Sequence, residues 1–280
     1  MNFLFPLATI VSWSIATILD KLNYTRNRIA PKQLMLIVFT GMSLSLALYI
    51  VITHKPFPNF SPVALGLLGL IGLISFLGNV FDYFSLKAND LPLREPIVDF
   101  EPIWAGLVGY AFLPSERKPA YLVIFALGAL ILYIGMHRIK LRRLQKEGVW
   151  YLLLSTFFYG LLPVIYKHAL NYLSPEYISL FRVVAILLLC SIFLHGKKSR
   201  SHSLSKVTYG LSSGAIAAVG AVANLYAIQY LGVVVTMLFL ATGPALRYLA
   251  SYFILSEKVR RVEVMSSFLL IAVVLVGVAI

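Results

Sequence analysis

Charged residues are scarce in this chain of 280 residues: Asp, Glu, Lys and Arg make up 12% of it, whereas 60% of the residues are hydrophobic. An average globular domain contains about 25% charged and about 45–50% apolar residues. So few charges cannot cover a water-soluble surface, and the chain also lacks a charged tail, a heptad array and a low-complexity tract. These absences argue against a soluble enzyme and a disordered scaffold, and they indicate an integral membrane protein.

Cysteine and the common cofactor motifs are also nearly absent. Cys190 is the single cysteine, so no intrachain disulfide can form and a cysteine-based metal site is excluded. The five histidines lie at or near predicted helix ends and form no i, i+4 pair, so we predict no metal site. The sequence contains neither G-x-x-x-x-G-K-[ST] nor H-E-x-x-H. We therefore predict no cofactor.

Acidic residues are fewer than basic residues, and the formal net charge is +13. The basic residues cluster between apolar runs, within 21–32, 138–146 and 197–206. Anionic lipid head groups and the positive-inside bias favour this pattern, so we expect membrane lipids as partners and no nucleic acid. Lys and Arg are far more frequent after odd-numbered apolar runs than after even-numbered ones. The positive-inside rule then predicts that both termini lie outside the cytoplasm.

Apolar runs of about 17–25 residues recur along the chain, and each can cross about 30 Å of hydrocarbon as a helix. They predict an all-α polytopic membrane protein with ten transmembrane helices, at 3–20, 33–53, 62–86, 93–113, 119–137, 149–168, 176–194, 207–230, 233–255 and 262–280. Prolines crowd the start of the fourth run, and a helix that began only after Pro102 would be too short to span. The segment from Leu93 must therefore contribute, which places its charges inside the membrane or at its boundary.

The two halves of the chain share a pattern of polar residues and prolines between their apolar runs. Asp82 and Pro102 have the same spacing as Asn224 and Pro244, and the runs Leu113–Glu116 and Leu255–Glu257 follow in matching places. Each half contains five spans, an odd number, so the second half must cross the membrane in the opposite sense. We predict two inverted five-helix repeats around a central cavity. Their bounds are 1–137 and 149–280, with a basic loop at 138–148 between them.

Three stretches resemble the EamA branch of the drug/metabolite transporter superfamily: Trp13-Ser14, Pro102–Glu116 and Pro244–Glu257. The resemblance covers the whole chain. It implies ten helices around a cavity lined mainly by helices 1, 3, 4, 6, 8 and 9. It also implies movement, often export, of small metabolites such as amino acids without ATP hydrolysis. The charges of the fourth helix depart from the family, where small or apolar residues are more usual.

Ionisable groups within spans are costly, and each is therefore a candidate for a functional site. In the fourth span Glu95 and Asp99 share one helix face, and Arg94 and Glu101 share the other. Asp99 or Glu101 is a candidate carrier of a coupled proton or cation. The alternative is that both acids are paired with Arg or Lys for structure, while Arg94 and Glu95 lie at the head-group boundary.

Other charged residues are candidates for substrate binding. Asp82 could bind a substrate amine, and its alternative is an ion pair with Lys87 or Lys21. Arg247, just after Pro244, is assigned as a clamp for a substrate carboxylate, and Arg182 is given a structural role. Lys21 and Lys167 end their spans, where they either reach the interface or anchor an anion.

The remaining candidates for the cavity wall are mainly aromatic. Five aromatic side chains could line the cavity and stack on a substrate or its ammonium group, although packing is the alternative: Trp13, Tyr83, Trp104, Tyr159 and Tyr226. Asn224 occupies the place of Asp82 in the second half. Glu116 and Glu257, at matching helix ends, are predicted to cap helices or gate loops and not to touch substrate.

These features favour a secondary transporter that exports a small polar metabolite, such as an amino acid or amine, by alternating access without ATP. It would lie in the inner membrane of a prokaryotic cell. A lipid or lipid-linked-sugar flippase is an alternative within transport. An alternative of another class is a membrane-embedded enzyme that uses Asp82, Asp99 and Glu101 as an acid cluster.

Overall fold

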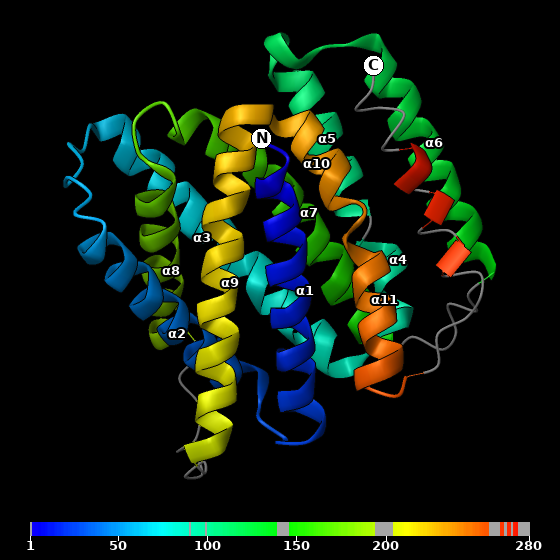
Figure 1. The fold of residues 1–280 in the computed structure, drawn as a ribbon, viewed down its shortest axis with the longest axis horizontal. Coiled ribbons are helices and arrows are strands. Elements are labelled where there is room, and N and C mark those ends of the chain that lie inside the picture. Colours follow the sequence, from blue (N-terminus) through cyan, green and yellow to red (C-terminus); the bar gives the residue numbers. More distant parts are fainter. Residues whose placement is uncertain are drawn as a thin grey trace.

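A computed structural model describes residues 2–89, 91–98, 100–138, 146–193 and 204–257, together with three short pieces at 264–265, 268–269 and 271–273. The described elements are all helical (Figure 1). In chain order they are α1 (Leu4–Thr25), α2 (Pro31–Ile52), α3 (Pro62–Ala88), α4 (Leu91–Val98), α5 (Phe100–Phe112), the 3₁₀ turn η1 (Pro114–Glu116), α6 (Pro119–Arg138), α7 (Lys146–Ala169), α8 (Pro175–Phe193), α9 (Leu204–Leu231), α10 (Val233–Leu240) and α11 (Gly243–Ile254).

Seven segments of the described chain are long and apolar enough to cross a membrane. They correspond to seven of the ten predicted spans: those at 3–20, 33–53, 62–86, 149–168, 176–194, 207–230 and 233–255. The predicted span at 93–113 is divided between α4 and α5, and α6 supplies a shorter apolar stretch, Pro119–Ile131. Most of 262–280 and of the basic loop at 138–148 lies outside the described residues. The protein is an all-helical, polytopic membrane protein.

Proline defines where several helices begin. Pro31, Pro62 and Pro175 are the first residues of α2, α3 and α8. At this position the missing N–H costs nothing, because the first four N–H groups of a helix have no partner within it. The Ser61 hydroxyl caps α3 by accepting a hydrogen bond from the Ala64 N–H at 3.1 Å.

Proline also accompanies the break between α10 and α11. Pro244 lies in the first turn of α11, directly after the turn at 241–242 that ends α10. A proline within a helix removes a hydrogen bond and disfavours the preceding turn, although Pro163 is accommodated inside α7. The predicted span at 233–255 is therefore a pair of short helices. Pro102 likewise lies in the first turn of α5, which follows α4, and Asp99 between these helices lies outside the described residues.

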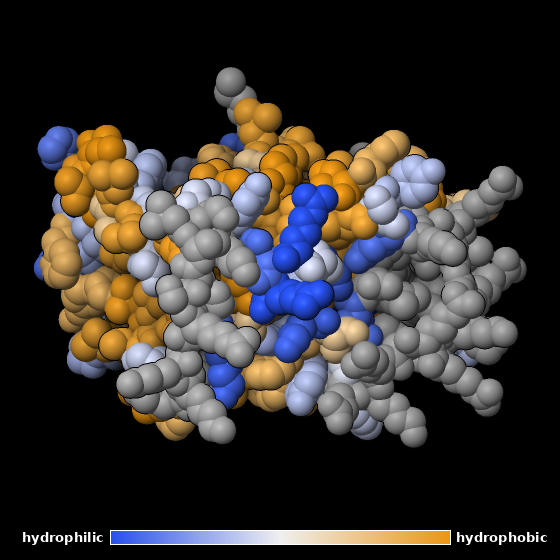
Figure 2. Space-filling view, turned by 90° about the horizontal axis from the view of Figure 1, so that it is seen from below, coloured by the Kyte–Doolittle hydropathy of each residue, from blue (hydrophilic) through white to orange (hydrophobic). Residues whose placement is uncertain are grey.

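The main helix contacts join the two halves of the sequence. α1 packs along α9, α3 packs along α7, and α5 packs against α7 and α10 (Figure 1). α2 and α9 approach backbone to backbone at Gly214, where a Cβ atom would collide with the Val38 carbonyl and lie 2.7 Å from the Met42 nitrogen. Figure 2 looks at one end of the bundle, where hydrophilic side chains gather near the centre and hydrophobic ones occupy parts of the margin. This distribution fits a bundle that presents its sides to lipid.

Candidate functional site

A cavity of about 210 Å³ lies where helices of both halves meet. Its wall includes side chains from α1, α2, α3, α4, α5, α7, α8, α9, α10 and α11. Six of the sequence-predicted site residues line it: Trp13, Asp82, Glu101, Tyr159, Asn224 and Arg247. Asp99 and the side chain of Glu95 lie outside the described residues, so their assignments stay predictions.

Charges of both signs line this cavity. Its described wall carries three acids and three arginines: Asp20, Asp82, Glu101, Arg94, Arg182 and Arg247. Arg94 and Glu101 share the cavity, as their seven-residue spacing predicts. The Arg94 side chain is only 3% exposed and forms an ion pair with Asp82, so it is held inside the helix bundle. The partner of Asp82 is thus Arg94, where the sequence suggested Lys87 or Lys21.

Three buried polar atoms of residues that line the cavity have no hydrogen-bond partner within the described part of the chain: Arg94 Nε, Arg182 Nε and Asn224 Oδ1. Arg182 on α8 donates through Nη1 to the Tyr166 hydroxyl at 2.9 Å, but its buried Nε has no partner. The buried Oδ1 of Asn224 on α9 is likewise unpaired. Buried polar atoms are rarely left unsatisfied, so such atoms at a cavity wall are available to a polar ligand. Arg182 therefore joins the candidate ligand-binding residues.

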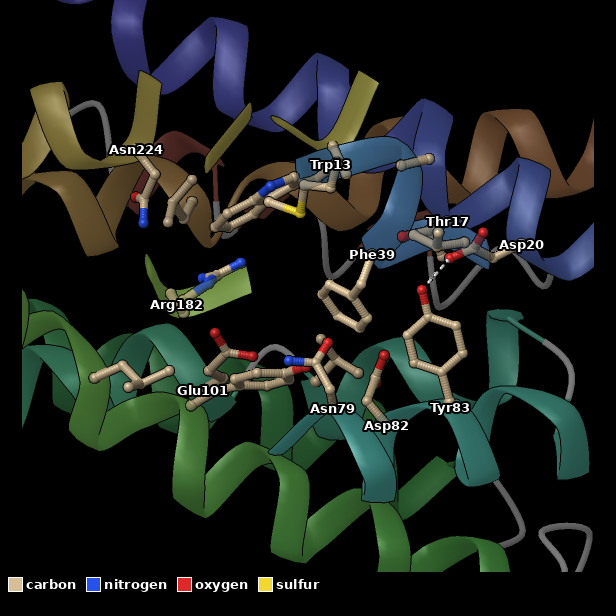
Figure 3. Close-up of a pocket in the computed structure, with 18 of the residues that line it drawn as sticks. Trp13, Thr17, Asp20, Phe39, Asn79, Asp82, Tyr83, Glu101, Arg182 and Asn224 are labelled. Carbon is tan, nitrogen blue, oxygen red and sulfur yellow. Dashed lines mark hydrogen bonds between the residues drawn. The ribbon is translucent and has the colours of Figure 1, made fainter. Parts of the chain in front are cut away.

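Asp20 on α1 supplies a second polar region. Its carboxylate is 7% exposed and accepts hydrogen bonds from the Ser213 hydroxyl at 2.7 Å and the Tyr83 hydroxyl at 3.0 Å. Figure 3 shows Asp20, Asp82 and Tyr83 toward one end of the cavity, and Arg182, Glu101 and Asn224 toward the other. Trp13 and Phe39 lie between the two groups. A ligand with polar groups at both ends and an apolar middle would match this arrangement.

Tyr226 lies outside the cavity lining. It is two residues from Asn224, so it points to nearly the opposite face of α9. Its hydroxyl donates to Glu176 Oε1 at 2.5 Å, and its ring stacks on Phe5 at a centroid distance of 5.2 Å. Lys55 binds the same Glu176 oxygen at 2.9 Å, and this hydrogen bond raises the pKa of Lys55. Tyr226 therefore belongs to an outer polar cluster formed with Lys55 and Glu176.

Lys21 and Lys167 cap helix C-termini in matching ways. The Lys21 ammonium donates to the carbonyl oxygens of Leu86, at 3.1 Å, and of Asn89 at the end of α3. The Lys167 ammonium donates to the Ile228 carbonyl oxygen, at 3.1 Å, near the end of α9. A cation is favourable there, because carbonyl groups at a helix C-terminus are unpaired and carry partial negative charge.

Glu116 and Glu257 cap helix N-termini of the opposite half, which confirms the capping role predicted for them. Glu116 accepts hydrogen bonds from the N–H groups of Val233 and Val234, at 3.0 and 2.8 Å. Glu257 accepts one from the Leu91 N–H at 3.2 Å. These caps lie toward opposite ends of the bundle, after α5 and after α11 (Figure 1).

Sequence reasoning missed several polar cavity residues: Thr17, Asp20, Asn79 and Tyr166. Tyr83, one of the aromatic candidates, does line the cavity. Asp20 had a usable signal, since it is an acid directly before Lys21 in an otherwise apolar helix. The hydroxyl groups gave no such signal, because Ser and Tyr are ordinary residues of membrane helices. Their importance depends on which charged group they contact.

Residues 146–279 match the model of the EamA-like transporter family. The matched region covers 134 of the 280 residues, and the family is part of the drug/metabolite transporter superfamily. Together with the seven apolar helices, the match indicates an integral, multi-pass membrane protein. The match agrees with the resemblance noted in the sequence.

The fold of this chain is also found among solved structures. One of them, described only as the crystal structure of a protein, has a TM-score of 0.75 to this chain at 16% sequence identity. The similarity covers 99% of this chain and 97% of the other. At that identity the likeness establishes the shared fold alone. No curated protein matches the sequence.

Proposed function

We propose that this protein is a secondary transporter that moves a small polar metabolite, such as an amino acid or amine, by alternating access without ATP. The cavity is the substrate site in this proposal. The observation that carries it is the set of unsatisfied polar atoms, Arg94 Nε, Arg182 Nε and Asn224 Oδ1, in a cavity lined by acids and arginines. A substrate that carries both an anionic and a cationic group could pair with the arginines through the first and with the acids through the second.

The matched contacts of the two halves support an inverted repeat of two five-helix units. Lys21 and Lys167 cap corresponding helices, and Glu116 and Glu257 each cap a helix of the opposite half. Inverted repeats place a substrate site between two similar halves, which can then exchange roles in an outward- and an inward-facing state. The proposed direction is export, in keeping with the family resemblance.

Ligand-dependent thermal stability of the detergent-purified protein tests the substrate class. The panel contains amino acids, amines, nucleosides and lipid head groups. A ligand at 100 times its dissociation constant adds about 2.7 kcal/mol if it binds only the folded state. A shift with a zwitterion or an amine is expected. A shift with lipid head groups alone would favour the flippase instead.

Flux of the stabilising compound into proteoliposomes then tests transport at this site. Arg247→Ala and Asp82→Asn should abolish saturable flux, since they remove one charge of each sign from the cavity. Leu65→Ala is the control, because Leu65 is 55% exposed on the outer surface of α3. Normal flux in both cavity variants, at normal stability, would refute the assigned site.

A further inference from the structure

We propose that Asp20 is the proton-binding group of the transport cycle, and that its protonation rearranges the contact between α1 and α9. This inference rests on the proposed transport function and adds its coupling ion. It differs from the sequence-based candidates Asp99 and Glu101. The argument depends on the burial of Asp20, its hydrogen bonds and the alternative acceptor of Ser213.

Asp20 is buried without a cationic partner in the described part of the chain. By contrast, Asp82 forms an ion pair with Arg94, and Glu176 forms one with Lys55. The contacts of the Asp20 carboxylate are instead two hydroxyl groups, one from α3 and one from α9. A buried charge is costly unless it is compensated, so these hydroxyl groups decide which protonation states the site can hold.

The Ser213 hydroxyl can serve both protonation states. It has one hydrogen but two acceptors in reach, Asp20 Oδ1 at 2.7 Å and the Ala16 carbonyl oxygen at 3.2 Å. When Asp20 is ionised, Ser213 donates to the carboxylate. When Oδ1 carries a proton, that O–H can donate to Ser213 Oγ, and the serine hydrogen turns to Ala16. Tyr83 donates to Oδ2 in either state, so no hydrogen bond is lost.

Charged and titratable groups reach this region from several helices. They are Lys21 and Tyr24 on α1, Asp82 and Tyr83 on α3, Arg94 on α4 and Arg247 on α11. Lys21 is directed to the end of α3, and Arg94 to Asp82. The described residues of α2 and α10 at the cavity are apolar, and α9 contributes Ser213, which is not charged.

The position of Asp20 links its charge to the contact between the two halves. α1 belongs to the first half and α9 to the second, and Asp20 and Ser213 are 193 positions apart. A hydrogen bond to an ionised acceptor is about twice as strong as a neutral one. Protonation therefore weakens the Asp20–Ser213 bond and adds a neutral bond from Ser213 to the Ala16 carbonyl oxygen, so the contact between α1 and α9 is rearranged. A conformational state that holds α1 and α9 differently is then favoured or disfavoured by the charge of Asp20.

The proton balance of this step is simple. A proton from water on one side of the membrane binds Asp20 Oδ1, and the same proton leaves to water on the other side after the conformational change. No bond to substrate forms and no electron moves. One proton is carried for each cycle in which Asp20 is protonated on one side and released on the other.

Infrared difference spectroscopy of the purified protein during a pH titration tests the proton site without any substrate. We expect a protonated carboxyl band that disappears as the pH rises, that is lost in Asp20→Asn and that remains in Asp82→Asn. Asp20→Glu should keep a titrating band at a shifted frequency, which covers the case in which Asp20→Asn does not fold. A band that persists unchanged in Asp20→Asn would overturn the proposal.

Cysteine labelling tests the effect on the helix contact. Cys190→Ala removes the only cysteine, and Thr17→Cys places a thiol on α1 at the cavity. Asparagine mimics the protonated acid, so labelling of the parent and of the added Asp20→Asn variant should agree at low pH. They should differ by about fivefold at high pH, where the charge-assisted bond of the parent is present.

The ratio is taken between labelling rates corrected for the thiolate fraction measured in each variant, because Asp20 lies one helical turn from position 17 and its charge also acts on the thiol. A ratio that is constant over the whole pH range would overturn the coupling to α1 and α9. Failure of this inference and failure of the proposed function are distinguishable. A titrating Asp20 in a protein that moves no compound would refute transport, whereas substrate flux with no titrating Asp20 would refute the proton site.

Discussion

Glu116 provides the sharpest test of how the two halves hold each other. Its carboxylate accepts the N–H groups of Val233 and Val234, which are the first two of α10. The preceding residue, Gly232, has a φ of 85° and would place a Cβ 2.9 Å from the carboxylate. This glycine lets the acid approach the helix end closely. We predict that Glu116→Ala destabilises the folded protein although Glu116 lies outside the cavity.

The magnitude of the destabilisation follows from the two hydrogen bonds that Glu116→Ala removes. Removal of a helix cap costs about 1 kcal/mol, and here one side chain satisfies two N–H groups. We expect a loss of about 2 kcal/mol in the free energy of unfolding, which is about a 30-fold change in the folding equilibrium. Glu116→Gln keeps one oxygen acceptor but loses the charge that favours the N-terminus of α10, so a loss of about 1 kcal/mol is expected.

The assay is unfolding of the detergent-solubilised protein by SDS, followed by circular dichroism. Glu257→Ala is the matched variant in the second half, where one hydrogen bond to the Leu91 N–H is lost. Arg117→Ala is the control, because the neighbouring Arg117 is bonded at an exposed position to carbonyl groups of its own half. Equal stability of Glu116→Ala and the wild type would refute the capping argument. So would a loss in Glu116→Gln as large as in Glu116→Ala.

Three further variants test the packing and the polar contacts. Gly214→Ala should cost about 1–3 kcal/mol in SDS unfolding, because its methyl group meets the backbone of α2. Gly66→Ala is the control and should be neutral, because a methyl group there meets open space. Equal effects of the two variants would contradict the close approach of α2 and α9. Lys55→Met should cost about 1 kcal/mol at neutral pH. The pKa of Lys55 is raised in the folded state, so the stabilisation by its charge is complete below about pH 10, the ordinary lysine pKa. This stabilisation is lost as the pH rises through the raised pKa. A difference in unfolding free energy between variant and wild type that stays constant to high pH would argue against the ion pair. Lys167→Met should lower the free energy of unfolding by about 1 kcal/mol, and the loss should show as faster amide exchange at the end of α9; unchanged exchange there would contradict the capping role.

The sequence predicted much of the local structure because hydropathy and proline act over short distances. Apolar runs indicated the membrane class and the approximate bounds of α1, α2, α3, α7, α8 and α9. The matching positions of polar residues in the two halves indicated Glu116 and Glu257 as helix caps. The predicted span at 93–113 is covered by α4 and α5, and Asp99 between them lies outside the described residues.

The candidate site was predicted only in part. Spacing on one helix placed Arg94 and Glu101 on a common face, and repeat matching indicated Asp82 and Asn224, which line the cavity. Tyr226 was selected by the same reasoning, but its helix face turns it to Glu176. Periodicity can assign a residue to a face, but it cannot tell which neighbour that face will meet.

The sequence alone determined that this protein is a helical membrane protein with a repeated pattern of charges and prolines, because these properties follow from composition and local spacing. Only the tertiary structure decided the partners of the buried charges. Asp82 meets Arg94, Arg182 meets Tyr166, and Asp20 meets a serine 193 positions away. In a low-dielectric interior the chemistry of an ionisable group depends on the groups within a few ångströms of it, and helix packing between distant segments sets those neighbours.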